Sequence, residues 1–304
     1  MSKEKLSFKQ FWELSEIYTA PLNLFIILLG VSAAKFIQQL SLSKDLLIFI
    51  GIILCFHLSV NIFNHWMDYQ HASDLHFKEK TNIIGREHLS ISVVKRYFYT
   101  FMILAALFGL YLVSQTTIII GILGMLGFYI GLFYSYGKYP INSLFLAETI
   151  TSIASGFFIM FIAFYLAIPH REVVNTRIIL SLFFISLPLV LSMFNNLLAN
   201  NTCDLEEDIN NGRKTLVYYI GKKHAVTLLL TLTIASYLWI GILVYLKLAP
   251  IVTLGLLILL PITLKELKKY TQYQDKKETF PVVLKTMSVM MVLYPIIYAL
   301  GGFF

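Results

Sequence analysis

Nine apolar stretches, each close to the length of a membrane-crossing helix, constrain this chain more than any other feature. A bilayer-spanning helix needs roughly 20 mostly apolar residues. The stretches cover residues 18–38, 45–65, 97–114, 117–135, 143–167, 178–198, 226–246, 250–265 and 282–302. Only 13% of the 304 residues are charged, well below the usual share in soluble domains. We therefore predict an all-α integral membrane protein with nine transmembrane helices in one domain, residues 1–304.

The distribution of Lys and Arg predicts how the helices are oriented. If the N-terminus is cytoplasmic, most of the 24 Lys and Arg residues fall in cytoplasmic segments, as the positive-inside rule requires. The C-terminus is then outside. Basic loops beside anionic lipid also explain the net charge of +7, so the charge predicts a membrane surface and no nucleic-acid partner. No obligatory protein partner is predicted.

Two polar segments, residues 66–96 and 199–224, interrupt the apolar pattern. Both carry Asn and Asp at related spacings: Asn64, Asp68 and Asp74 around the first segment, and Asn200, Asp204 and Asp208 in the second. Residues four apart share a helix face, so Asn64 and Asp68 point the same way, as do Asn200 and Asp204. The segments follow the second and sixth predicted helices, which indicates an internal repeat of helices one to four and five to eight.

These spacings suggest a site for a cation and a phosphate ligand. Carboxylates near a membrane core usually face a bundle interior or a water-filled cavity. Two acidic clusters facing one cavity would repel each other unless cations lay between them. Mg²⁺ suits such a place, because it is typically held by one or two carboxylates together with substrate phosphates. Nearby cations, Lys80, Arg86, Arg213 and Lys214, could contact the phosphate oxygens.

Plainer interpretations exist for the same residues. Asp and Asn at helix ends are commonly caps or solvated loop residues, and Glu206 and Glu207 could lie on a solvated face rather than beside a metal. Five histidines between His57 and His88 invite a zinc interpretation, but their spacings match no known zinc template, so we expect solvated loop histidines. His65 alone is expected to touch the site.

At the level of motifs, the two segments resemble the aspartate-rich motifs of the UbiA superfamily of intramembrane prenyltransferases. "NHWMDYQHASD" and "NNTCDLEEDINNGRKTL" are most similar to the branch that prenylates 1,4-dihydroxy-2-naphthoate in menaquinone synthesis. "FYSYGKYPINSLFLAE", with Tyr134 and Glu148, looks like that family's Tyr-x-x-Gly-Pro-x-Pro segment and following Glu. Two residues depart from the pattern: His65 stands where the family usually has Asp, and Cys203 where this branch usually has Arg.

The resemblance implies a nine-helix UbiA-type bundle and a Mg²⁺-dependent reaction. A polyprenyl group would pass from polyprenyl diphosphate to an aromatic acceptor, 1,4-dihydroxy-2-naphthoate, giving demethylmenaquinone, CO₂ and diphosphate. By this resemblance the metal ligands are Asp68, Asp74, Asp204 and Asp208, and Asn64 joins them as a catalytic residue. The substrate-binding residues are Lys80, Arg86, Tyr134, Tyr136, Glu148, Asn200, Asn201 and Lys214.

Other functions are compatible with the same motifs. The acceptor could be 4-hydroxybenzoate, a haem or a glycerol phosphate. A different class is a secondary transporter whose repeated clusters bind a cation and an anionic solute, since repeated halves with intramembrane carboxylates are also typical of transporters. A membrane protein that only binds its ligand is a third alternative. For the enzyme we expect a location in the cell membrane, with the active site facing the cytoplasm.

Overall fold

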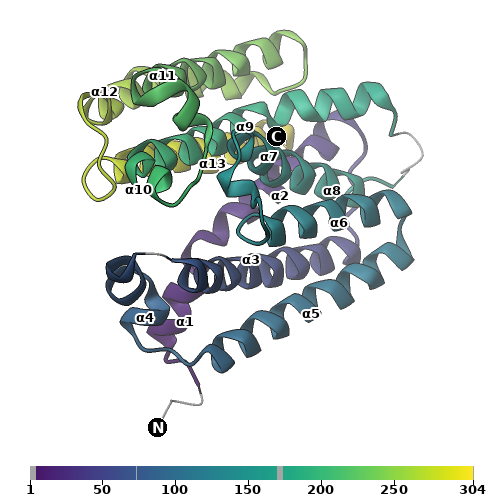
Figure 1. The fold of residues 1–304 in the computed structure, drawn as a ribbon. Coiled ribbons are helices and arrows are strands. Elements are labelled where there is room, and N and C mark those ends of the chain that lie inside the picture. Colours follow the sequence, from purple (N-terminus) through teal and green to yellow (C-terminus); the bar gives the residue numbers. More distant parts are fainter. Residues whose placement is uncertain (1–4, 73, 170–173, 304) are drawn as a thin grey trace. The chain divides into compact units, whose positions relative to one another are not determined.

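The computed structural model describes residues 5–72, 74–169 and 174–303, and this part of the chain is helical without a strand (Figure 1). Seven helical segments are long and apolar enough to cross a membrane: Ile17–Ile37, Lys44–His71, Ile91–Gln115, Ala147–Leu166, Thr176–Cys203, Leu216–Tyr245 and Phe280–Phe303. The other two predicted spans correspond to the shorter apolar helix α6 (Ile118–Phe133) and to η6 (Ile251–Ile258) followed by α12 (Leu259–Gln272). The all-helical membrane prediction is confirmed, whereas nine spans and the orientation of the termini stay predictions.

Two compact units make up the chain. The first comprises residues 1–23 and 44–142, and the second comprises residues 24–43 and 143–304. The second predicted span and the first polar segment belong to the first unit, and the sixth span and the second polar segment belong to the second. The single domain and its internal repeat stay predictions.

The first unit is built around two long helices, α3 (Lys44–His71) and α5 (Ile91–Gln115), which run side by side (Figure 1). Its shorter elements are α1 (Phe8–Leu14), η1 (Ile17–Thr19), η2 (Phe77–Thr81), α4 (Ile83–Arg86), α6 and, at the unit's end, η3 (Ile141–Ser143). Trp66 and Met67 near the end of α3 are buried in a cluster with Leu14 of α1 and Phe98 of α5. This apolar packing fixes the turn of α3 that carries Asp68.

The second unit is organised around α9 (Thr176–Cys203), which packs against α11 (Leu216–Tyr245), α13 (Phe280–Phe303) and α7 (Ala147–Ile153). The remaining elements are α2 (Pro21–Ile37), η4 (Ala154–Phe158), α8 (Ile159–Leu166), α10 (Leu205–Asn210), η6 and α12. Helices α7, η4 and α8 form one continuous apolar segment, residues Ala147–Leu166.

Buried polar side chains join the helices of the second unit. Asn195 of α9 donates hydrogen bonds to the Leu229 carbonyl oxygen and to Thr233 Oγ1 of α11, both at 3.0 Å. The Tyr294 hydroxyl of α13 donates to the Ile185 carbonyl oxygen of α9 at 3.0 Å. Polar groups inside a membrane helix bundle need such partners, because lipid supplies none. These bonds therefore set the register of α11 and α13 against α9.

A glycine lets α2 approach α8 closely. A Cβ atom on Gly30 would lie 2.4 Å from the Met160 carbonyl oxygen, a distance that side chains essentially never show. Small residues at such points allow the backbones of membrane helices to pack directly on each other. Gly30 is thus a structural requirement of this unit.

Candidate active site

The first motif occupies the last turns of α3, where its side chains are half-buried. Asn64 Oδ1 accepts a hydrogen bond from the Ser135 hydroxyl at 3.0 Å. Ser135 lies in the segment after α6 that also carries Tyr134 and Tyr136, so the structure brings the first motif together with the predicted tyrosine segment. Asp68, one turn after Asn64, is also half-buried.

The loop that follows α3 holds the remaining predicted residues of the first motif. Asp74 is exposed, and its Oδ1 accepts a hydrogen bond from the His76 amide at 2.8 Å, which is an ordinary turn-capping role. Lys80 on η2 is exposed. Arg86 forms an ion pair with Glu13 of α1, with Nη2 2.6 Å from Oε1. Arg86 therefore connects α1 to this loop.

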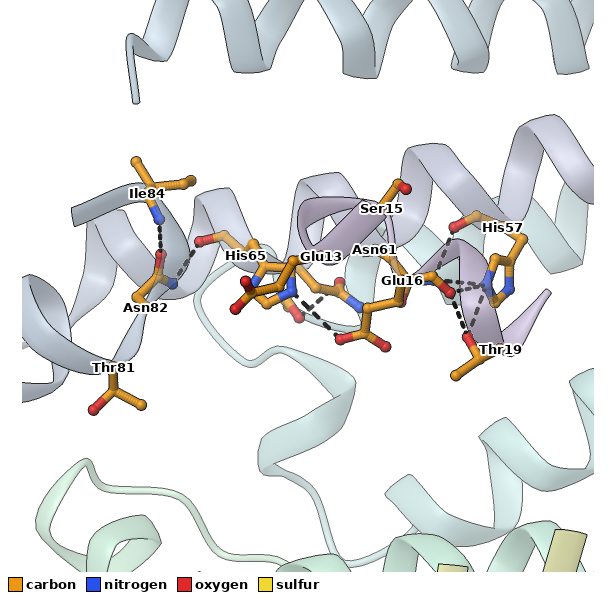
Figure 2. Close-up of polar contacts among 12 residues, drawn as sticks. Glu13, Ser15, Glu16, Thr19, His57, Asn61, His65, Thr81, Asn82 and Ile84 are labelled. Carbon is orange, nitrogen blue, oxygen red and sulfur yellow. Dashed lines mark hydrogen bonds and ion pairs between the residues drawn. The ribbon is translucent and has the colours of Figure 1, made fainter. Parts of the chain in front are cut away.

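His65, the residue that departs from the resembled motif, pairs with a carboxylate of the N-terminal segment. Its Nε2 atom lies 3.3 Å from Glu16 Oε1 (Figure 2). The Asn82 side-chain amide donates to the His65 carbonyl oxygen at 2.9 Å, and Asn82 Oδ1 accepts from the Ile84 amide at 2.9 Å. A carboxylate is thus present beside position 65, and Glu16 supplies it. Sequence reasoning missed Glu16 because it lies far from the motif along the chain.

A second polar network lies one to two turns earlier along α3, at Asn61 and His57. His57 Nε2 is 3.0 Å from Thr19 Oγ1 and 3.1 Å from Asn61 Nδ2 (Figure 2). His57 Nδ1 is 3.2 Å from Asn23 Nδ2. Each ring nitrogen of His57 therefore has partners. The network ties the segment after α1 to α3, and it gives His57 and Asn61 a structural role.

Asn200 and Asp204 of the second motif share one face at the end of α9, as their spacing predicts. The Asn200 amide nitrogen donates to Asp204 Oδ2 at 3.2 Å. A cation already lies between these two side chains: Lys276 forms an ion pair with Asp204 and donates to Asn200 Oδ1 at 2.5 Å. Cys203, which stands where the resembled branch usually has Arg, carries no positive charge, but Lys276 supplies one beside Asp204. The sequence did not indicate this contact, because nothing near Lys276 along the chain marks it as a partner of α9.

Asp208 lies on the short helix α10 and is buried, whereas Asp204 of the same motif is half-buried. Asp208 forms an ion pair with Arg213, whose Nη1 atom lies 3.5 Å from Oδ1. Burial raises the pKa of Asp208 to about 6, although the Arg213 charge acts in the opposite direction. Burial therefore makes the ionised form of Asp208 energetically unfavourable, and a nearby cation would stabilise that form.

The residues around Asp208 have different roles. Glu206 is exposed and pairs with Lys222 at 2.8 Å, which lowers the pKa of Glu206 and supports the interpretation of a solvated face. The Lys214 amide donates to the Ser143 carbonyl oxygen at 3.1 Å, and the Lys214 ammonium lies 5.7 Å from the centre of the Tyr218 ring. The Lys214 backbone is thus held in place, while its exposed side chain lies beside the Tyr218 ring.

Glu148, at the start of α7, is fully buried. Its Oε1 atom accepts a hydrogen bond from the Asn201 amide at 2.8 Å, so two predicted substrate-binding residues meet within the second unit. Its Oε2 atom has no hydrogen-bond partner among the described residues. Buried polar atoms are nearly always paired in native proteins. An unpaired carboxylate oxygen here indicates a place for a hydrogen-bond donor that a ligand supplies.

Residues 5–72, 74–169 and 174–303 contain no group of three or more His, Cys, Asp or Glu side chains that could hold a metal ion by themselves. The oxygen donors present, carboxylates and the Asn200 amide, are nevertheless the type that Mg²⁺ prefers. Because Mg²⁺ often takes only one or two protein carboxylates and completes its shell with phosphate and water, this donor set fits the ion. The same donors in Asn200 and Asp204 hold the Lys276 ammonium.

Comparisons with known proteins decide the family. A sequence model of the UbiA prenyltransferase family matches residues 23–292. The chain belongs to the UbiA prenyltransferase family. It is similar to 1,4-dihydroxy-2-naphthoate octaprenyltransferase of Bacillus subtilis, with 28% identity over 235 residues that cover 75% of this chain and 71% of the relative. The protein is therefore a prenyltransferase, and the transporter alternative is set aside.

Solved UbiA structures share its fold. A UbiA homologue from Archaeoglobus fulgidus bound to DMAPP and Mg²⁺ has a TM-score of 0.63 and 14% identity, covering 96% of this chain and 98% of that one. The apo structure of a UbiA homologue from Aeropyrum pernix K1 has a TM-score of 0.68 and 12% identity, covering 94% and 97%. At these identities the likeness concerns the fold. All the predicted site residues of this UbiA prenyltransferase lie within the matched residues 23–292.

Proposed function

We propose that this UbiA prenyltransferase transfers a polyprenyl group from polyprenyl diphosphate to 1,4-dihydroxy-2-naphthoate in a Mg²⁺-dependent reaction. The observation that carries the proposal is the pair Asn200 and Asp204, whose oxygens already hold a cation, in a chain related to a naphthoate octaprenyltransferase. The proposal also includes nine membrane spans, a location in the cell membrane and an active site on the cytoplasmic side, which the positive-inside rule supports.

The residues of both motifs have roles in binding the diphosphate. Asp68, Asp74, Asp204 and Asp208 would hold Mg²⁺, which when bound neutralises the negative charge of the departing diphosphate. Lys80, Lys214 and Arg86 contact its remaining oxygens, since cations pair strongly with phosphate. For Arg86 this requires release from Glu13, which lies 2.6 Å away. Much of the rate acceleration then comes from electrostatic stabilisation of the leaving group.

Transfer breaks the bond between the prenyl C1 atom and the diphosphate oxygen, and both electrons leave with diphosphate. The allylic cation is attacked by the electron-rich naphthalene ring, which forms a carbon–carbon bond and loses its carboxylate as CO₂. The product formed directly is the reduced quinol, which gives demethylmenaquinone on oxidation. Tyr134 and Tyr136 offer ring faces to the cation. Trp66 is less suited, because it is buried and Lys95 lies 5.0 Å from its ring centre.

Glu148 and Asn201 bind the acceptor in this proposal. The buried Oε2 atom of Glu148, unpaired within the part of the chain that the structure describes, can accept a hydrogen bond from an acceptor hydroxyl. Asn201 holds the other carboxylate oxygen at 2.8 Å and so fixes the direction of Oε2. An acceptor without a hydroxyl group would leave this oxygen unpaired at a cost of about 1–3 kcal/mol.

The test is an assay of membranes that contain the protein, supplied with Mg²⁺, a labelled polyprenyl diphosphate and a panel of acceptors. The expected result is release of diphosphate and CO₂ with a lipid-soluble product from 1,4-dihydroxy-2-naphthoate. Product from 4-hydroxybenzoate or another acceptor instead would overturn the acceptor assignment. Asp68→Ala and Asp204→Ala should abolish turnover while the protein still inserts, and Glu79→Ala, at an exposed loop position, is the matched control. Near-normal rates in both Asp variants would show the metal assignment to be wrong.

A further inference from the structure

Lys276 lies in a tightly hydrogen-bonded turn between α12 and α13. Asp275 Oδ1 accepts hydrogen bonds from the amides of Lys277 and Glu278, each at 2.8 Å. The Asp275 amide donates to Thr279 Oγ1 at 2.8 Å, and Thr279 is fully buried. Side-chain bonds of this type fix the path of a turn. The backbone of Lys276 is therefore held in place, and only its side chain has freedom to move.

The ammonium group of Lys276 reaches from this turn to the second motif. It pairs with Asp204 and donates to Asn200 Oδ1 at 2.5 Å, while it lies 5.3 Å from the centre of the Phe280 ring. Its side chain is 46% exposed, so it can leave this position without disturbing a packed core. The group thus occupies the same oxygens that would bind a divalent cation.

We propose that Lys276 is an internal competitor of the divalent cation at Asp204. While no metal is bound, the Lys276 ammonium balances the Asp204 charge. When the metal arrives together with a diphosphate, Lys276 leaves Asp204 and pairs with the diphosphate, so that little interaction energy is lost. A metal ion that arrives alone offers Lys276 no new partner. The site therefore selects the metal–diphosphate complex over the free metal ion.

This inference rests on the proposed function. It predicts that removing the Lys276 charge has opposite effects on metal binding and on pyrophosphate binding. Without diphosphate, removing the Lys276 charge frees Asp204 and tightens metal binding. An ion pair between partly exposed groups is worth little, so the expected gain in affinity is about two- to fivefold. With inorganic pyrophosphate present, the same change removes a cation that pairs with phosphate, and pyrophosphate binding should weaken by a similar factor.

The experiment uses the purified full-length protein in detergent and Mn²⁺ as the probe, with free Mn²⁺ measured by electron paramagnetic resonance. Lys276→Met is compared with the wild type and with Lys277→Met, a neighbouring exposed lysine that serves as the charge-matched control. We expect tighter Mn²⁺ binding in Lys276→Met alone. Lys276→Arg keeps the positive charge and should retain wild-type affinity. Pyrophosphate binding in the presence of Mn²⁺ is then measured for each variant by calorimetry.

The outcomes separate this inference from the proposed function. If Asp204→Asn loses the Mn²⁺ site but Lys276→Met binds Mn²⁺ like the wild type, the competition is wrong and the metal assignment stands. An equal gain in Lys277→Met would also overturn it, because general surface charge would then explain the effect. If Asp204→Asn binds Mn²⁺ like the wild type, the metal assignment itself is wrong and the competition falls with it.

Discussion

The pair formed by Glu148 and Asn201 allows a prediction about how a buried carboxylate is tolerated in this protein. Glu148 is fully buried, and its Oε1 atom accepts a hydrogen bond from the Asn201 side-chain amide at 2.8 Å. Asn201→Leu removes that donor, so that neither carboxylate oxygen keeps a side-chain partner within the described part of the chain. The cost of a buried unsatisfied group is about 1–3 kcal/mol, and it is larger when the group is charged. We expect the free energy of unfolding to fall by about 2–4 kcal/mol.

Thermal unfolding in detergent, followed by intrinsic fluorescence, measures this effect. The expected loss corresponds to a lowering of the Tm by roughly 3–6 °C. Glu148→Gln is the matched variant, because it keeps the shape and can still accept from Asn201 but carries no charge. It should stay within about 1 kcal/mol of the wild type in stability. Glu148→Gln should also lose turnover. An NH₂ group then replaces Oε2 and cannot accept the hydrogen bond from the acceptor hydroxyl.

The double variant Glu148→Gln, Asn201→Leu decides whether the two residues act as a pair. Residues in one hydrogen-bonded pair give non-additive effects. The double variant should therefore be more stable than Asn201→Leu alone, because an unpaired amide is less costly to bury than an unpaired carboxylate. A Tm for Asn201→Leu equal to that of the wild type, or additive effects in the double variant, would refute the reasoning.

Three further predictions concern other parts of the chain. Gly30→Ala places a Cβ atom 2.4 Å from the Met160 carbonyl oxygen and should lower the free energy of unfolding by about 1–3 kcal/mol. Thermal unfolding measures this effect, and Gly51→Ala is the control because its Cβ atom meets no described atom within 4 Å. His65→Asp should keep turnover but lower the Tm, because it faces Glu16 with a like charge, and Glu16→Gln in the same chain should restore the Tm. EDTA should abolish turnover and added Mg²⁺ restore it; activity that persists in EDTA would contradict the metal requirement.

The helical membrane fold could be predicted from the sequence because hydropathy is a local property. A run of about 20 apolar residues is sufficient to specify a helix that crosses lipid, whatever its neighbours are. The spacing of Asn200 and Asp204 also predicted a shared helix face, and the 3.2 Å hydrogen bond between them confirms it. The prediction was less accurate at 250–265, where η6 is followed by a helix with several lysines, because short apolar stretches do not fix a regular α-helix.

The partners of the motif residues could not be read from the sequence. Glu16 and His65, Glu148 and Asn201, and Lys276 and Asp204 are distant along the chain, and their contacts depend on which helix faces meet. From the sequence alone, several basic loop residues could equally have paired with Asp204, and only the structure shows that Lys276 does so. Glu206 is exposed and pairs with Lys222, which supports the interpretation of a solvated face, while the role of Asp74 in metal binding stays a prediction.

The sequence by itself determined that this protein is a helical membrane protein with two Asn- and Asp-containing helix ends, and its motifs were sufficient to indicate the UbiA family. Hydropathy, periodicity and motif spacing are local properties of the chain, so they can be read without knowing how the helices pack. Only the tertiary structure decided that the fully buried Glu148 accepts a hydrogen bond from Asn201, and that the Lys276 ammonium pairs with Asp204. Both are consequences of how the helices and the turns between them pack, because packing places groups from distant segments within hydrogen-bonding distance.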